Sequence, residues 1–231
     1  MGSKARRPLR ALSTVLITSG LLMLIDAGLT VAWQEPVSAV YSHFVQGQLG
    51  DDLRELELAG PTDVDLAALR SLEDERARIA FLARGLRRRS DAGDAVARIR
   101  VPSAAINKVV VNGTDGASLR KGPGLYDDHP FPGAPGTVAI AGHRTTYGAP
   151  FRRLNRVGKG DEITVEMPYG TFTYRVEKTA IVDDSAVEVV RRVSYDRLVL
   201  TACHPLYSAA QRIVVFARFQ SAEPRGQALK R

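Results

Sequence analysis

The chain has 231 residues, of which 45% are hydrophobic and 25% are charged, a composition that excludes a disordered chain and suits one sizeable globular domain. Its 32 Lys and Arg against 25 Asp and Glu give a net charge of +7, which alone would favour a nucleic-acid partner. Much of the excess lies at the two ends of the chain, so we expect no nucleic-acid binding.

The first predicted element is a membrane helix. Residues 1–10 form a tail with four basic residues and no acid, and an apolar run from Ala11 to Trp33 follows it. At 1.5 Å per residue this run spans about 34 Å, enough for a hydrocarbon core of about 30 Å. The basic tail predicts a cytoplasmic N-terminus, so the sequence indicates a single-pass cell-membrane protein whose remainder is extracytoplasmic. The alternative is a cleaved signal peptide, whose apolar run is usually shorter.

Residues 34–94 are predicted to form a helical hairpin. Apolar residues recur at spacings of three and four from Val37 to Leu56, and Ala59-Gly60-Pro61 ends this first helix. Thr62 or Asp63 then caps a second helix whose apolar stripe continues to Leu86. Arginines gather at its C-terminal end, as the helix dipole favours, and we interpret them as a solvated helix end, with anionic lipid or nucleic acid as the alternative partner. These arginines are Arg84, Arg87, Arg88 and Arg89.

From residue 95 to 220 the pattern changes to short β-type runs separated by Gly, Pro and Asp. Seven or eight such strands are typical of a closed barrel or a sandwich, so the predicted fold class is mainly β. Within this domain only residues 149–155 are predicted to be helical, and residues 221–231 form a polar C-terminal tail. The predicted strands are 97–101, 108–111, 137–141, 162–167, 171–178, 180–182, 197–202 and 212–219.

Cys203 is the only cysteine of the chain. One cysteine outside the cytoplasm forms no internal disulfide, so its thiol is available for chemistry or for pairing with another molecule. The alternative is a buried cysteine that fills a small apolar space. Strand alternation places Val199, Thr201 and Cys203 on one face, with the thiol at a strand end where a loop can expose it.

Two further residues suit acyl transfer by Cys203. His143 ends the apolar run GTVAIAGH at another strand-to-loop junction, and Arg212 opens a strand nine residues after the cysteine. A thiolate attacks, an imidazole protonates the leaving amine, and a guanidinium donates hydrogen bonds to the oxyanion. His204 is the alternative base, but adjacent strand residues point to opposite faces, which disfavours it. Without catalysis, His143 would be a structural histidine and Arg212 a surface cation.

Three motifs in this order, AGHRTTYGAPF (141–151), TACHP (201–205) and the later arginine, resemble the sortases, most closely the class E group of actinobacteria. LRKGPGLY (119–126) and MPYGTFTY (167–174) extend the resemblance over residues 95 to 219. It implies an eight-stranded β-barrel and the catalytic set His143, Cys203 and Arg212. It also implies that a sorting signal is cleaved between Thr and Gly, held as a thioester on cysteine and passed to an amine.

The resemblance also implies partners and substrate contacts. The partners are secreted proteins with a C-terminal LPXTG-type signal, or LAXTG for class E, and an acceptor amine on a peptidoglycan precursor or a pilin. The usual sortase signature Thr-Leu-x-Thr-Cys reads VLTAC (199–203) here, so both outer threonines are replaced. Thr201 or Thr145 is then expected to take over from the threonine that usually precedes the cysteine. The residues expected to contact substrate are Tyr126, Thr145, Thr201 and Ala202.

Other functions fit the sequence less well. An L,D-transpeptidase would carry a Ser-His-Gly-Cys context, which is missing, whereas a pilin-polymerising sortase would share all three candidate residues. A non-catalytic cell-surface barrel would have no need of the three together. The sequence has no zinc-ligand cluster, phosphate loop, dinucleotide fingerprint or concentrated acidic loop, so we expect neither a cofactor nor a metal.

Overall fold

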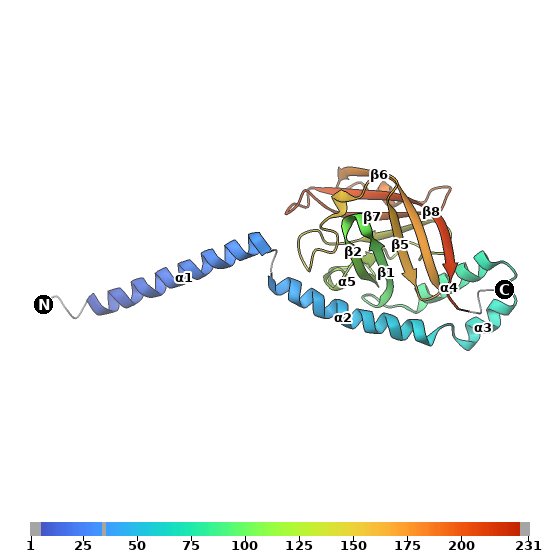
Figure 1. Cartoon of the computed structure of the whole chain (residues 1–231), viewed down its shortest axis with the longest axis horizontal. Helices are drawn as coiled ribbons and strands as arrows, with labels where there is room; N and C mark the ends of the chain where they lie inside the picture. Colours follow the sequence, from blue (N-terminus) through green and yellow to red (C-terminus); the bar gives the residue numbers. More distant parts are fainter. Residues whose placement is uncertain (1–5, 34–35, 227–231) are drawn as a thin grey trace.

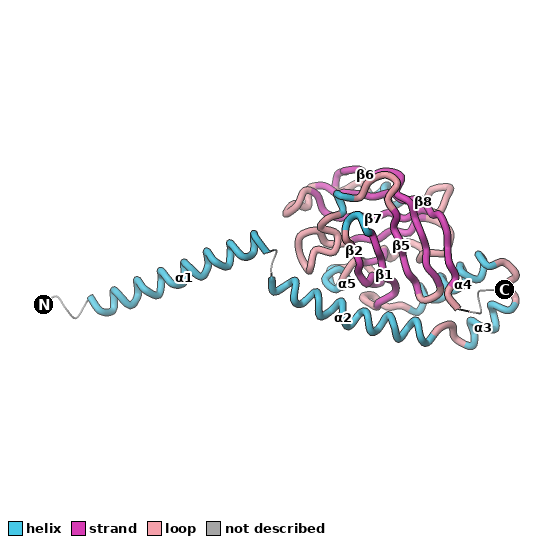
Figure 2. Tube along the Cα trace, viewed as in Figure 1, coloured by secondary structure: helices cyan, strands magenta, loops and turns pink. Residues whose placement is uncertain are grey.

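The computed structural model describes residues 6–33 and 36–226, and its main body is a closed β-barrel (Figures 1 and 2). The order around the barrel is β1-β2-β3-β4-β7-β8-β6-β5, and β5 pairs with β1 to close it. Neighbouring strands are antiparallel except for the parallel pairs β2–β3 and β4–β7. The strands are β1 (Ala95–Val101), β2 (Ile106–Asn112), β3 (Gly124–Leu125), β4 (Thr137–Ala141), β5 (Glu162–Met167), β6 (Gly170–Asp183), β7 (Arg197–His204) and β8 (Gln211–Pro224).

Alternation along β7 shows how the barrel is filled. Leu198, Leu200 and Ala202 belong to the main apolar core, whereas Val199 packs with Val214 and Phe216 in a separate cluster. Burying a side chain such as Leu200 contributes about 1.5–3 kcal/mol, so a shift of register by one residue would be costly. The mainly β, closed-barrel prediction is confirmed, as is the alternation predicted around Cys203.

An apolar helix, α1 (Arg6–Trp33), precedes the barrel and extends away from it (Figure 1). Its stretch from Arg10 to Gly28 is long and apolar enough to cross a membrane, and none of that stretch is buried in the protein. The predicted N-terminal apolar helix is therefore present and begins before Ala11. Residues 1–5 of the expected basic tail lie outside the described residues.

Helix α2 (Pro36–Ala59) lies along the barrel wall. The Gln46 side chain fixes it there: Oε1 accepts from the Val109 amide at 2.8 Å, and Nε2 donates to the Val109 carbonyl at 3.1 Å and the Lys121 carbonyl at 3.0 Å. The first predicted helix thus packs on β1 and β2. Its buried residues Val45, Leu49 and Leu53 form one cluster with Ala95, Val109 and Val111.

The second predicted helix is two helices, α3 (Asp63–Arg70) and α4 (Glu75–Arg89). Thr62 caps α3 as predicted, and Asp74 starts α4 by accepting from the Ala77 amide at 2.9 Å. Leu72 in the break still packs against the core, so the apolar spacing continues across it and conceals it. Of the terminal arginines, Arg89 forms an ion pair with Asp65 at 3.3 Å, so that part of the helix end is not simply solvated.

Other local predictions also need correction. The runs 171–178 and 180–182 form one strand, β6. They looked like two strands in the sequence because a register shift between Val176 and Lys178 displaces the alternation by one residue. The strand β3 and the helix α5 (Gly116–Lys121) are too short for the sequence to show a period. Residues 149–155 form turns that lead into a 3-10 turn at Leu154–Arg156. Strand β8 continues into the expected polar tail, whose residues 227–231 lie outside the described residues.

Candidate active site

A cavity of about 250 Å³ at the ends of β4, β7 and β8 brings the three candidate catalytic residues together. Thr145 of the expected substrate set does not line this cavity; it lies half-buried on the loop after His143. The structure therefore gathers every predicted site residue except this one in a single hollow. The predicted residues that line the cavity are Tyr126, His143, Thr201, Ala202, Cys203 and Arg212.

Strand pairing explains why residues distant in sequence meet here. Cys203 and Arg212 lie directly opposite each other on the antiparallel pair β7–β8, where facing residues have Cβ atoms about 4.5–5.5 Å apart. On the other side of β7, Ala141 of β4 is the register partner of Thr201. The Gly142 amide also donates to the Thr201 carbonyl at 3.0 Å, so the chain carries His143 toward the level of Cys203.

The loop that begins at His143 wraps around a buried ring. The Phe151 amide donates to the His143 carbonyl at 3.0 Å, and a Cβ at Gly142 would lie 2.6 Å from the Phe151 ring, so only glycine fits there. The His143 ring packs 5.0 Å from that of Tyr147. Burial lowers the pKa of His143 below its usual 6.5, so the imidazole is mainly neutral at neutral pH. A neutral imidazole can accept a proton from a thiol.

Arg212 is held by the backbone of its own hairpin. Its Nη1 donates to the Ala209 carbonyl at 2.7 Å and to the Gln211 carbonyl at 3.0 Å. Among the described residues no carboxylate forms an ion pair with this guanidinium. The rest of the planar fork is therefore available to a carbonyl or oxyanion in the cavity.

His204 lies outside the cavity and contacts Arg144, a residue that the sequence analysis missed. Arg144 is buried, and its Nη1 lies 2.8 Å from His204 Nδ1 and 3.4 Å from the Cys203 carbonyl, while Nη2 donates to Asn155 at 3.0 Å. Burial lowers the pKa of Arg144, Arg152 adds to that effect, and Cys203 acts against it. An arginine directly after the candidate base, in AGHRTT, was the available sequence signal.

The threonine nearest to the nucleophile also has a defined partner. The Thr201 hydroxyl and the Tyr126 hydroxyl lie 3.0 Å apart, and both side chains line the cavity. Of the two threonines expected to compensate for Ala202, the structure therefore places only Thr201 at the site.

A comparison with protein families gives the family of this chain. The family described as the Sortase domain matches residues 99–220, more than half of the 231 residues. The chain belongs to the sortase family. It is a cysteine transpeptidase, and its barrel is of the sortase type. Sortases act outside the cytoplasm on proteins with sorting signals, and α1 is consistent with a membrane anchor or a signal sequence.

Similar sortases come from more than one group. Sortase D of Bacillus subtilis is 27% identical over 201 residues, which cover 85% of this chain and 96% of that protein. Sortase SrtE1 of Streptomyces coelicolor is 30% identical over 101 residues, covering 40% of this chain and 29% of that protein. Among solved structures, sortase E of Streptomyces avermitilis has a TM-score of 0.53 and 29% identity, covering 61% of this chain and 99% of that one.

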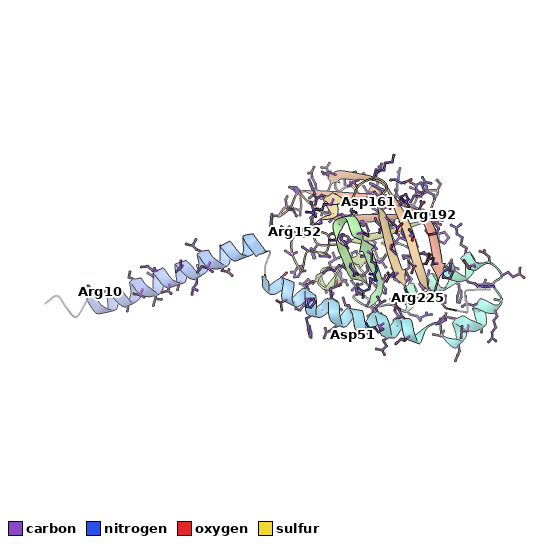
Figure 3. All side chains as sticks on the ribbon, viewed as in Figure 1. Arg10, Asp51, Arg152, Asp161, Arg192 and Arg225 are labelled. Atoms are coloured by element: carbon purple, nitrogen blue, oxygen red, sulfur yellow. The ribbon has the colours of Figure 1, made fainter. Side chains whose placement is uncertain are left out.

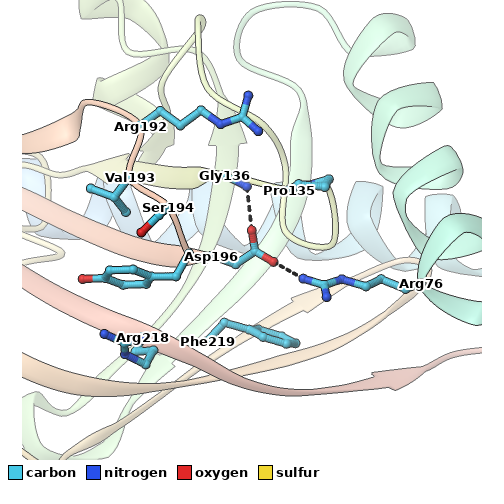
Figure 4. Close-up of a pocket in the computed structure, with 10 residues that line it drawn as sticks. Arg76, Pro135, Gly136, Arg192, Val193, Ser194, Asp196, Arg218 and Phe219 are labelled. Atoms are coloured by element: carbon cyan, nitrogen blue, oxygen red, sulfur yellow. Dashed lines mark hydrogen bonds and ion pairs between the residues drawn. The ribbon is translucent and has the colours of Figure 1, made fainter.

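A larger hollow of this sortase lies away from the candidate site (Figure 4). Its volume is about 410 Å³, and Asp196 at its centre accepts from the Gly136 amide at 2.7 Å and pairs with Arg76. Arg218, also in the hollow, pairs with Glu177 at 2.6 Å. These charged groups satisfy one another, and the hollow contains none of the candidate catalytic residues. Nor do the described residues contain a group of three or more His, Cys, Asp or Glu placed to hold a metal ion.

We expect Arg144→Lys to lower the turnover of the sortase by about tenfold. Lysine keeps the charge but cannot bridge His204, Cys203 and Asn155 from one planar group, and a lost hydrogen bond to a charged group costs about 1.5–3 kcal/mol. Turnover of a signal peptide and thermal unfolding would be measured side by side. Arg152→Lys, with a 3.3 Å bond to the Tyr207 hydroxyl, is the matched control. Normal turnover in Arg144→Lys would show that the bridge is dispensable.

Proposed function

We propose that this sortase is a membrane-anchored enzyme of the class E type that cleaves a C-terminal sorting signal and transfers the protein to a cell-wall amine. The observation that carries the proposal is the one cavity that His143, Cys203 and Arg212 line together. The motifs around His143 and Cys203 and the 30% identity with SrtE1 support class E. The match to Sortase D covers more of the chain, so the class is the part that most needs a test.

The position of each group in the cavity supports the following reaction. The Cys203 sulfur attacks the carbonyl carbon of the signal threonine, and neutral His143 takes the thiol proton. Arg212 donates to the oxyanion that forms. The imidazolium then protonates the leaving glycine amine, which leaves a thioester on Cys203. An acceptor amine attacks the thioester, His143 removes its proton, and the thiol is restored.

Mass spectrometry of the full chain with a small panel of peptides and amines tests this function. The panel contains LAXTG and LPXTG peptides, a peptidoglycan-type amine and a pilin-type lysine peptide, with Cys203→Ala as the control protein. We expect cleavage between Thr and Gly, preference for LAXTG, and transfer to the peptidoglycan-type amine. Preference for the lysine peptide would favour a pilin-polymerising sortase. No cleavage of any peptide would contradict the proposed substrate class.

We expect Arg212→Lys to lose at least about tenfold in turnover while folding normally. If Arg212 were only an exposed cation, replacing it by lysine would change turnover little, because exposed ion pairs are worth about 0–1 kcal/mol. A planar fork that donates to an oxyanion is not replaced by lysine, and the loss of one such donor typically costs about 10² to 10³ in rate. Arg212→Ala should be worse still. Thermal unfolding of each variant controls for stability, and a stable lysine variant with full turnover would reduce the catalytic set to His143 and Cys203.

The topology predicts that the chain stays in the membrane with its barrel outside. Basic residues precede Ala11 and the barrel follows α1, so protease added to intact spheroplasts should digest the barrel. A cytoplasmic marker protein must remain intact in the same sample. A protected barrel would reverse the topology, and a soluble form whose N-terminus lies near Trp33 would replace the anchor by a cleaved signal peptide.

A further inference from the structure

Helix α2 exposes three large apolar side chains near its start. Val40 is 73% exposed, Tyr41 51% and Phe44 64%. They are distinct from the buried residues that hold α2 on β1 and β2. We call Val40, Tyr41 and Phe44 the α2 patch. The exposed residues that follow it carry no apolar side chain until Leu58, near the end of the helix: Gly47, Gln48, Asp51, Asp52, Arg54 and Glu55.

The chain itself brings the α2 patch close to the predicted bilayer surface. Helix α1 ends at Trp33 and α2 begins at Pro36, so the patch begins seven residues after the end of α1 and twelve residues after Gly28, where the candidate span ends. Along α2, Phe44 lies about 12 Å from Pro36. Interfacial helices bury their apolar face about 5–10 Å into the headgroup boundary, and tyrosine is enriched at that depth. A bilayer crossed by α1 is therefore the apolar phase within reach of the α2 patch.

The same part of α2 contacts the loop that carries His143. The Gly148 amide donates to Ser38 Oγ at 3.4 Å, and Ser42 is buried against Gly148, where a Cβ would collide with it. Arg152, further along this loop, lies at the end of the barrel nearest to α1 (Figure 3). If the start of α2 is held on a bilayer surface, the same contact therefore also fixes the distance between that surface and the candidate active site.

We propose that the α2 patch seats on the outer surface of the bilayer that α1 spans and holds the His143 loop at the lipid headgroups. The proposal deepens the proposed function, because it rests on α1 as an anchor. The occupant is the lipid surface itself, and the active site then faces substrates and amine acceptors that are tethered to the same bilayer.

Lipid quenching of a fluorophore on the full chain tests this arrangement. In a Cys203→Ala background, single cysteines are introduced as Phe44→Cys, Met23→Cys and Leu58→Cys, labelled with the same environment-sensitive dye and placed in liposomes that contain phosphatidylglycerol. Met23 lies in α1, whereas Leu58 is an 82% exposed apolar residue on α2, about 21 Å further along the helix than Phe44. Lipids with a quencher near the headgroup are compared with unlabelled lipids.

We expect quenching at positions 23 and 44 and none at 58, with the quenching at 44 lost when Val40→Ser and Tyr41→Ser are added. Quenching at 23 without quenching at 44 would overturn the patch and leave the anchor in place. Equal quenching at 44 and 58 would show that the whole helix lies on the bilayer, and it would overturn the patch. Quenching at 44 that survives the two serine substitutions would show that the dye itself binds the lipid, and it would also overturn the patch. A chain that is unquenched at 23 would overturn the patch together with the anchor. Because no readout depends on turnover, failure of the proposed reaction is detected separately.

Discussion

Cys203→Ala is expected to abolish both cleavage and transfer while the barrel stays folded. The sulfur forms the covalent intermediate, so without it no thioester can carry the acyl group. In a serine protease, removal of the nucleophile costs about 2 × 10⁶ in kcat. Cys203 is only half-buried at the end of β7, so replacing its sulfur by hydrogen removes little packing.

Two measurements decide this prediction. In the wild-type protein, mass spectrometry should detect an adduct on Cys203 equal to the signal peptide without its glycine-containing remainder. In the alanine variant the adduct and both products should be missing, and thermal unfolding should match that of the wild type. Residual turnover by an uncontaminated, folded Cys203→Ala protein would refute Cys203 as the nucleophile.

Predictions from the sequence succeeded where periodicity and burial determine the structure. On β7 a period of two places Leu198 and Leu200 in the main core and Val199 in a second cluster, so a one-residue slip would exchange the side chains of the two faces. The same reasoning disfavoured His204, and the structure places its ring on Arg144, outside the cavity. The candidate catalytic residues lie at the ends of strands, and the pattern of apolar runs in the sequence predicts where those strands end.

Predictions were less complete where a local pattern carries no information about tertiary contacts. Thr145 lies on a loop whose path depends on positive φ angles at Tyr147 (52°) and Ala149 (42°), which composition does not indicate. The break after α3 was hidden because Leu72 still packs against the core. The position of Arg144 depends on a loop and a strand meeting, because its partners come from both.

The two histidines next to the cavity are expected to differ widely in importance. General acid–base catalysis contributes typically about 10² to 10⁴-fold, and we expect His143→Ala to lose a factor in this range. Its imidazole lines the cavity with Cys203, and burial lowers its pKa so that it begins the reaction as a base. His204→Ala removes a hydrogen bond with the charged Arg144, of a kind worth about 1.5–3 kcal/mol, but this contact lies outside the cavity and should cost far less in rate than the loss of the base.

The ranking of the two variants tests the geometry of the site. Initial rates for one signal peptide and one amine would be measured for His143→Ala, His204→Ala and the wild type, after thermal unfolding has shown that all three are folded. A loss in His143→Ala that exceeds the loss in His204→Ala by at least about tenfold would agree with a base at the end of β4. The opposite ranking would place the base beside the nucleophile in sequence. The β4–β7 pairing, which brings the chain from Ala141 alongside Thr201, would then position a structural residue and not the proton-transfer group.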